Sequence, residues 1–116
     1  MLTVCIFSLA VNAHSCGNNE EASKLAKLII EDSEQKRSVI RCNQLLFDIA
    51  HEKAQDMREF GMVVHNLKGS PNGRLEEAGF ELPDHYGKSF NSNQVEAIAG
   101  GYSNAEEVWE AFKNSA

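Results

Sequence analysis

Histidine and carboxylate side chains are the groups in this sequence that could do chemistry. A neutral imidazole such as that of His65 suits zinc, and a carboxylate can share the metal or orient the ring. Zinc is therefore the candidate cofactor for such side chains, but a protein zinc site typically has about three or four ligands. Taken one at a time, His65 also fits a ring packed at a helix exit, and Glu96 fits an exposed carboxylate near a turn.

The other polar residues receive no ligand role. His51 faces away from the apolar stripe of its predicted helix, so we expect it to be exposed, and Arg74 should hold a carboxylate such as Glu77 or Glu81. No serine or cysteine nucleophile has a base at a suggestive spacing, and there is no phosphate-binding loop or dinucleotide fingerprint. The residues alone therefore establish no catalytic activity.

The first residues differ from the rest of the chain. Residues 2–11 are mostly apolar and uncharged, and residues 11–13 place small or apolar side chains where a signal peptidase would cleave. The run is too short to cross a bilayer, which needs roughly 20 apolar residues. It predicts a signal peptide over residues 1–13, no transmembrane segment, and a secreted or periplasmic protein. The positive segment that normally precedes such a run is missing, and a short buried strand or helix is the alternative.

Two cysteines remain if that segment is removed together with Cys5. Cys16 and Cys42 are an even number of cysteines in an oxidising compartment, where a disulfide between them would tether the start of the mature chain to the second predicted helix. Two unpaired thiols, with Cys42 buried and Cys16 exposed, fit the sequence equally.

Composition indicates one globular domain and limits its partners. The chain has 116 residues, of which 42% are hydrophobic and 24% are charged, as in ordinary folded proteins. Its formal net charge is −6, and its densest basic stretch, residues 36–41, is diluted by acidic neighbours. Binding to nucleic-acid phosphates needs clustered lysine and arginine, so we expect no nucleic-acid partner. An anionic membrane surface is disfavoured for the same reason.

Apolar spacing and capping residues predict four helices. Asn43 is the N-cap of the second helix, and a capping box of Ser103 and Glu106 opens the fourth. The second helix should bury one face that is apolar apart from a single lysine. The expected helices span residues 18–32, 44–60, 70–79 and 103–115, and the buried face of the second comprises Leu46, Ile49, Ala50, Lys53, Ala54, Met57 and Phe60.

The segments around these helices bear on the fold. Residues 63–65 leave the second helix as a short extended piece, and residues 80–93 form a long polar surface loop. The last helix presents Trp109 and Phe112, each worth roughly 2–3 kcal/mol when buried. Nothing follows these rings to cover them, so we expect the chain to stop before its domain is complete.

From residue 43 onward the chain resembles a known family. Residues 46–57 resemble the L-x-x-x-A-x-x-x-A-x-D-M helix of CAP proteins, the cysteine-rich secretory, antigen-five and pathogenesis-related superfamily of SCP-like extracellular proteins. Residues 61–65 look like the G-x-x-x-H step after that helix, and residues 71–80 resemble the bacterial P-x-x-R-x-x-x-A-G-[YF] stretch. Residues 96–101 look like the E-N-I-A-x-G box. Residues 105–115 are similar to the helix that follows the box and its W-M-x-S end.

This resemblance implies a fold and a site. The fold would be α+β, with this chain forming the amino-terminal, mostly helical part of an α-β-α sandwich with little strand. His65 and Glu96 would lie in one binding cleft and be the ligands of an incomplete metal site. The chain would divide into a signal peptide (residues 1–13), an amino-terminal extension with the first helix (residues 14–42) and a partial CAP domain (residues 43–116).

The resemblance also implies a function, with two departures from the family pattern. Ala97 replaces the asparagine of the E-N-I-A box, and the motif with the family's second histidine would begin just after Ser115, where this sequence ends. A secreted or periplasmic binding module without established catalysis is the function implied, and its ligand would be a lipid, a cell-wall component or a protein. A metal-assisted hydrolase completed by residues beyond Ala116 is one alternative, and a non-functional truncated fragment is another.

Overall fold

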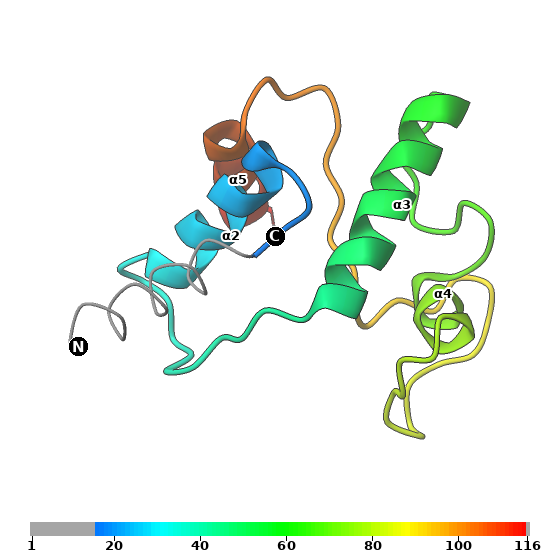
Figure 1. Ribbon diagram of the computed structural model, residues 1–116. Helices are drawn as coiled ribbons and strands as arrows, with labels where there is room; N and C mark the ends of the chain where they lie inside the picture. The colour runs from blue at the N-terminus through cyan, green and yellow to red at the C-terminus, as the bar shows by residue number, and fades with distance from the viewer. Residues whose placement is uncertain (1–15, 116) are drawn as a thin grey trace, which may run out of the picture. The chain divides into compact units, whose positions relative to one another are not determined.

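The computed structural model describes residues 16–115, and all regular secondary structure in that range is helical (Figure 1). The helices are α2 (Glu20–Glu31), α3 (Gln44–Phe60), α4 (Pro71–Glu77) and α5 (Ala105–Lys113). The predicted α+β fold is therefore wrong for these residues, which form no strand and no part of an α-β-α sandwich. The predicted signal peptide, residues 1–13, lies outside the described residues.

Two irregular segments, residues 62–64 and 96–100, lie close together without forming a pair of strands. Residues 62–64 are irregular, and residues 96–100 pass close to them, because a Cβ added to Gly100 would lie 2.5 Å from Cγ2 of Val63. A strand pair also needs a ladder of backbone hydrogen bonds between its segments. No such bond joins these two segments within residues 16–115, so their approach does not make a sheet.

The described chain divides into two compact units. The first comprises residues 16–47 and 102–115, and it contains α2 and α5. The second comprises residues 48–101, and it contains most of α3, all of α4 and both candidate site residues, His65 and Glu96.

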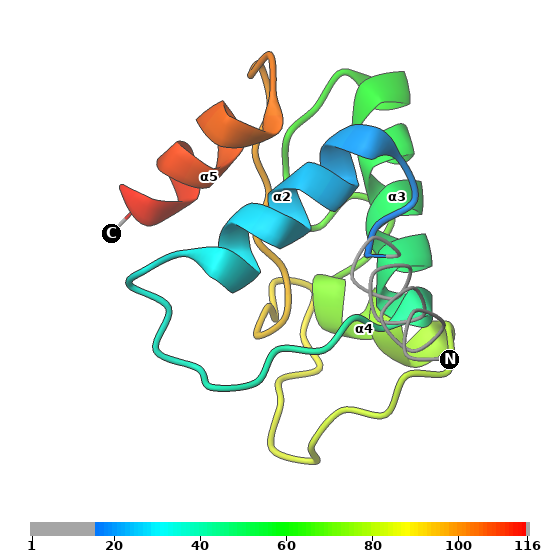
Figure 2. The same ribbon diagram turned by 60° about the vertical axis from the view of Figure 1, so that its left-hand side comes forward.

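In the first unit α2 and α5 pack side by side, as both views show (Figures 1 and 2). The amide of Ala105 donates to Oε2 of Glu21 at 2.8 Å, and the indole of Trp109 donates to Oδ2 of Asp32 at 2.9 Å. Trp109 and Phe112 are both half-buried. The helix that carries these rings is therefore packed against α2, which comes from an earlier part of the sequence.

The start of α5 differs from the prediction by one residue. Asn104 is the N-cap instead of Ser103, and its side-chain oxygen accepts a 2.9 Å hydrogen bond from the amide of Glu107. The Glu107 carboxylate in turn accepts from the amide of Ser103 at 2.9 Å, where Glu106 was the expected partner. Serine and asparagine are both strong N-caps, so their order in the sequence leaves two registers open.

Cys16 and Cys42 form a disulfide with their α-carbons 5.5 Å apart. Of the two alternatives that the sequence left open, the paired one is present. Cys16 is buried and Cys42 is exposed, the reverse of the burial expected for unpaired thiols. The bond ties the residue just before α2 to the segment that leads into α3.

α3 has the predicted bounds and the predicted ends. Asn43 Oδ1 accepts a 3.1 Å hydrogen bond from the amide of Leu46. Gly61 has a φ of 65°, the left-handed conformation that stops a helix, and the amide of Met62 donates back to the carbonyl of Met57 at 3.1 Å. This turn sends the chain towards His65.

The buried face of α3 is not the one that apolar spacing predicted. Its buried residues are Ile49, Lys53 and Asp56, whereas Ala50 and Ala54 are exposed. The face is rotated towards two charged residues because both find partners of opposite charge inside the second unit. Paired charges can be buried where isolated ones cannot.

α4 anchors the long loop that leads to the candidate site. Ser70 caps the helix by accepting from the amide of Gly73 at 3.0 Å. Asn72 is fully buried; it donates to the carbonyl of Gly87 at 2.9 Å and accepts from the amide of Gln94 at 3.1 Å. These bonds fix both sides of the loop immediately before the turn that carries Glu96.

Candidate functional site

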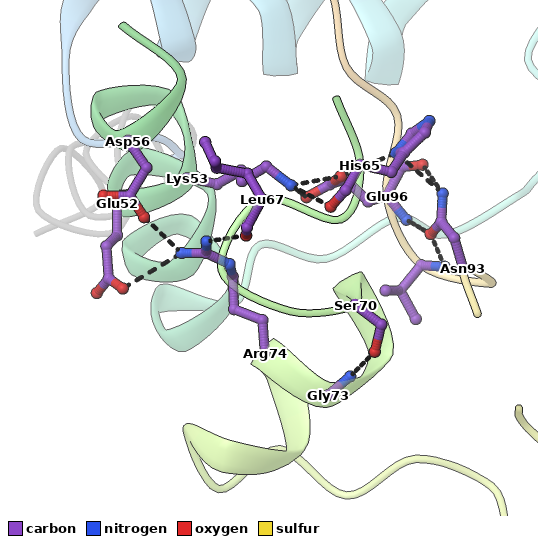
Figure 3. A network of polar contacts seen from close by, with 11 residues as sticks. Glu52, Lys53, Asp56, His65, Leu67, Ser70, Gly73, Arg74, Asn93 and Glu96 are labelled. Atoms are coloured by element: carbon purple, nitrogen blue, oxygen red, sulfur yellow. Dashed lines mark hydrogen bonds and ion pairs between the residues drawn. The ribbon is translucent and has the colours of Figure 1, made fainter. Parts of the chain in front are cut away.

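The candidate site gathers around a lysine that points into the second unit. Lys53 lies on α3, and only 2% of the residue is exposed. Its ammonium donates to both carboxylate oxygens of Glu96, at 3.1 and 3.2 Å, and to the backbone carbonyl of His65 (Figure 3). Burying an ammonium is costly unless it is paired and hydrogen-bonded, and these contacts meet both conditions.

His65 and Glu96 lie 31 positions apart in the sequence and are in direct contact. Nδ1 of His65 is 2.9 Å from Oε1 of Glu96. The imidazole side chain is 46% exposed, whereas the carboxylate side chain is 16% exposed. The two side chains that the resemblance assigned to one cleft therefore meet, with the carboxylate on the inner side and the imidazole facing outwards.

A turn at Asn93 presents the Glu96 side chain. Oδ1 of Asn93 accepts from the amides of Val95 and Glu96 at 3.1 and 2.8 Å, and Nδ2 donates to the carbonyl of Glu96 at 2.9 Å. Nδ2 also lies 3.2 Å from Nδ1 of His65. One asparagine therefore closes the turn and contacts the imidazole.

The hydrogen-bond network assigns the proton of the neutral imidazole to Nδ1. The Glu96 carboxylate already accepts from the Lys53 ammonium and can only accept, so Nδ1 of His65 must donate to it. The Asn93 amide has the Glu96 carbonyl as its acceptor. The lone pair of the ring then lies on Nε2, which has no protein partner within residues 16–115. This nitrogen can accept a hydrogen bond from a ligand.

An open groove of about 590 Å³ lies beside the imidazole. Groove volumes of roughly 300–1,000 Å³ are typical of small-molecule sites. The amides of Asn66 and Asn91, which are joined by a 3.1 Å hydrogen bond, add neutral polar groups to an otherwise largely apolar lining. The lining includes Val63, Val64, His65, Asn66, Asn91 and Ile98.

The geometry favours Glu96 as a group that orients the ring over Glu96 as a metal ligand. Both of its oxygens face the Lys53 ammonium, and one also contacts Nδ1 of His65. A metal at His65 would therefore bind Nε2, with the carboxylate behind the ring, an arrangement that protein metal sites commonly use. Within residues 16–115, no group of three or more histidine, cysteine, aspartate or glutamate side chains is placed to hold a metal ion.

A second charged cluster links α4 to α3 through side-chain ion pairs. Nη1 of Arg74 lies 3.0 Å from Oδ2 of Asp56 and 3.3 Å from Oε1 of Glu52 (Figure 3). The prediction that Arg74 pairs with Glu77 or Glu81 is therefore wrong. Both of those carboxylates are exposed, whereas Asp56 is buried, and an ion pair is screened less by water there.

Asp56 is the centre of this cluster. Its second oxygen lies 3.2 Å from Nζ of Lys68, and Arg74 is held further by a 2.9 Å bond from Nη2 to the carbonyl of Leu67. Burial raises the pKa of Asp56, but hydrogen bonds from Arg74 and Lys68 outweigh burial and hold the pKa below its usual value. The cluster thus connects α3, α4 and the segment that carries His65.

Lys53 is the site residue that the sequence analysis did not single out. It was noted only as the charged exception on an apolar helix face. A lysine at a position that helical periodicity places inside must have a buried anionic partner, and that is the signal that could have identified it. Of the other histidines, His51 is half-buried and not exposed as expected, and the exposed His85 contacts the ring of Tyr86 edge-on at 5.1 Å.

No family model, curated protein or solved structure matches the chain. The helices of residues 16–115 include none that is long and apolar enough to cross a membrane. Function is therefore inferred from the chemistry of the site itself.

Proposed function

We propose that this chain is a binding module of the CAP type that acts outside the cytoplasm and holds its ligand in the groove beside His65. The observation that carries this proposal is the 2.9 Å contact between His65 and Glu96. It places a partly exposed imidazole, oriented by a carboxylate, at the edge of a groove of small-molecule size. No bound nucleophile or complete metal site is needed for this role, so catalysis is not part of the proposal.

Two further observations support it. Asp56 and Arg74, which belong to two separate stretches of the resemblance, form a 3.0 Å ion pair. The disulfide between Cys16 and Cys42 is of the kind that persists in secreted and periplasmic proteins. The ligand classes that the resemblance implies are lipids, cell-wall components and proteins. A groove of about 590 Å³ with mixed apolar and amide lining favours a small molecule.

Binding is tested by titrating the ¹⁵N-labelled protein with a fatty alcohol and, separately, with a soluble cell-wall glycan fragment. The expected result is a saturable shift of the backbone amide signals of Val64, His65 and Asn66 with one of these probes, lost in His65→Ala. His85→Ala is the matched control, because this exposed histidine lies outside the groove, and it should bind as the unaltered protein does. Titrations in which neither probe moves these signals, or in which His65→Ala binds normally, would overturn the proposal.

Export is tested on the protein produced with its natural amino terminus. Cleavage after Ala13 would leave His14 as the first residue of the exported protein, which mass spectrometry of the secreted or periplasmic fraction measures. An intact Met1 in a cytoplasmic product would contradict an extracytoplasmic role.

A metal-assisted hydrolase is the second candidate, and the free Nε2 of His65 favours it. A histidine that donates through Nδ1 to a carboxylate and offers Nε2 is a common zinc ligand. The 116-residue chain should nevertheless bind zinc weakly or not at all, since two ligands at most are in place, and His65→Ala should change stability by less than about 0.5 kcal/mol. Tight stoichiometric zinc binding in calorimetry that His65→Ala abolishes would favour the hydrolase.

A further inference from the structure

Three residues of the second unit surround the inner side of the His65 ring. They are Glu96 and Asn93 from the turn, and Lys53 from α3. The carboxylate that the imidazole contacts is itself bound by a lysine ammonium whose side chain is only 3% exposed.

Lys53 contacts both residues of the Glu96–His65 pair. Its ammonium binds both carboxylate oxygens, so Glu96 stays an acceptor and the proton on Nδ1 of His65 has one acceptor to point at. The same ammonium donates to the backbone carbonyl of His65, which fixes the residue that carries the ring. Lys53 therefore holds both the carboxylate that the imidazole contacts and the backbone that carries the ring.

We infer that Lys53 is a positioning residue that holds Glu96 and the His65 backbone together, so that the neutral imidazole carries its proton on Nδ1 and offers the lone pair of Nε2 to a ligand. Because a lone pair accepts, the groove takes ligands that present a hydrogen-bond donor, such as a hydroxyl or amide N–H group, and not ligands that present a carboxylate or phosphate to this atom. The choice of ligand chemistry rests on the proposed binding function. The state of the ring does not, because it is measured without a ligand.

The test is the ¹⁵N NMR spectrum of the imidazole nitrogens at a pH of about 7.5, where an ordinary histidine is largely neutral. The His65 signals are assigned by their loss in His65→Ala. In the unaltered protein, Nδ1 should have the shift of a protonated nitrogen and Nε2 that of a nitrogen with a lone pair. An exposed histidine with no such partners favours the opposite tautomer, so a proton found on Nε2 would overturn the inference.

Lys53→Met keeps the length of the side chain and removes its charge. The carboxylate of Glu96 and the backbone of His65 then lose the group that binds both, so the preference for a proton on Nδ1 should fall, and both nitrogens should move towards the shifts of the opposite tautomer. Lys68→Met is the matched control, because it removes another lysine–carboxylate contact of the same unit without touching His65, and its spectrum should equal that of the unaltered protein. An unchanged His65 spectrum in a folded Lys53→Met protein would overturn the inference.

A double variant covers the case in which Lys53→Met does not fold. Lys53→Met with Glu96→Gln removes both charges together and leaves no unpaired buried charge, which is the milder change for a buried ion pair. A glutamine side chain can donate to Nδ1 as well as accept from it, so the preference for the Nδ1 proton should be lost. Retention of that preference would show that Lys53 and Glu96 do not set it. A groove that binds neither probe would overturn the proposed function alone.

Discussion

The ammonium of Lys53 lies 3.1 and 3.2 Å from the two carboxylate oxygens of Glu96, although 43 positions separate the two residues. The lysine side chain is 3% exposed and the glutamate side chain is 16% exposed, so both charges are largely withdrawn from water. Removing one partner of a buried pair leaves the other charge uncompensated. The loss of stability is larger when the charge that remains cannot reach water.

The two single substitutions at this pair should therefore be unequal. Glu96→Ala leaves the buried ammonium with the His65 carbonyl alone and should cost about 3 kcal/mol in the free energy of unfolding. Lys53→Met should cost less, because the Glu96 carboxylate keeps its contact with His65 and some access to water. Urea denaturation measures both, with Lys88→Met, in an exposed pair with Glu76, as a control expected to cost about 0–1 kcal/mol. A Glu96→Ala variant as stable as this control would contradict the buried pair.

The ion pair of Asp56 should make stability depend on pH. Burial raises the pKa of Asp56, but the bonds from Arg74 and Lys68 bring the pKa below its usual value. A carboxylate whose pKa is lowered by folding contributes stability that is present above its unfolded pKa of about 3.9 and is lost as the pH falls through the folded pKa. The free energy of unfolding should therefore fall on acidification below about pH 4.

Asp56→Asn should reduce this fall in the free energy of unfolding at acidic pH, because an amide does not titrate in that range. Denaturation midpoints measured over a series of pH values compare it with the parent protein. Glu52→Gln is the control, since the Glu52 side chain is 70% exposed and contacts the same arginine. An equal loss of stability at acidic pH in the Asp56→Asn and parent proteins would show that Asp56 is not the group responsible.

Trp109, the single tryptophan, should report the contact between α2 and α5. The pKa of Asp32 is lowered, first by the hydrogen bond from the amide of Glu34, then by that from the Trp109 indole, with burial acting against them. The indole contact should thus persist as the pH is lowered through the ordinary aspartate range near about 3.9 and weaken only below it. The fluorescence emission maximum of Trp109, followed on acidification, measures this, and Asp32→Asn should remove the acid transition. A transition of the same midpoint and size in Asp32→Asn would assign it to another group.

Reduction of the disulfide should destabilise the first unit. The bond between Cys16 and Cys42 spans a sequence separation of 26, and a loop of this length is worth about 3 kcal/mol in the chain-entropy model. Denaturation followed by Trp109 fluorescence, with and without a reductant, measures the loss. A Cys5→Ser background keeps the third cysteine out of the reaction. Thiol counting on the unfolded, unreduced protein in that background should find no free thiol, and two free thiols would contradict the pairing.

The helices were predictable because their signals are local. Asn43 and Gly61 define the ends of α3 through hydrogen bonds and backbone angles that involve only a few neighbouring residues. Local signals were weaker where two residues compete for one role, as at Ser103 and Asn104. The contact between α2 and α5 could not be predicted at all, because the amide of Ala105 and the carboxylate of Glu21 meet across 84 positions.

The sequence by itself determined which residues have the right chemistry, and the tertiary structure decided how those residues are used. His65 and Glu96 were identifiable from their types and from the resemblance, and the cysteines from their number. Helical periodicity marks Lys53 only as a charged residue on an apolar face, yet its ammonium binds the Glu96 carboxylate that contacts His65. Likewise the segments at residues 62–64 and 96–100 come together without becoming strands. The physical reason is that charge pairing and backbone ladders depend on groups brought together through space, which periodicity along a single helix does not encode.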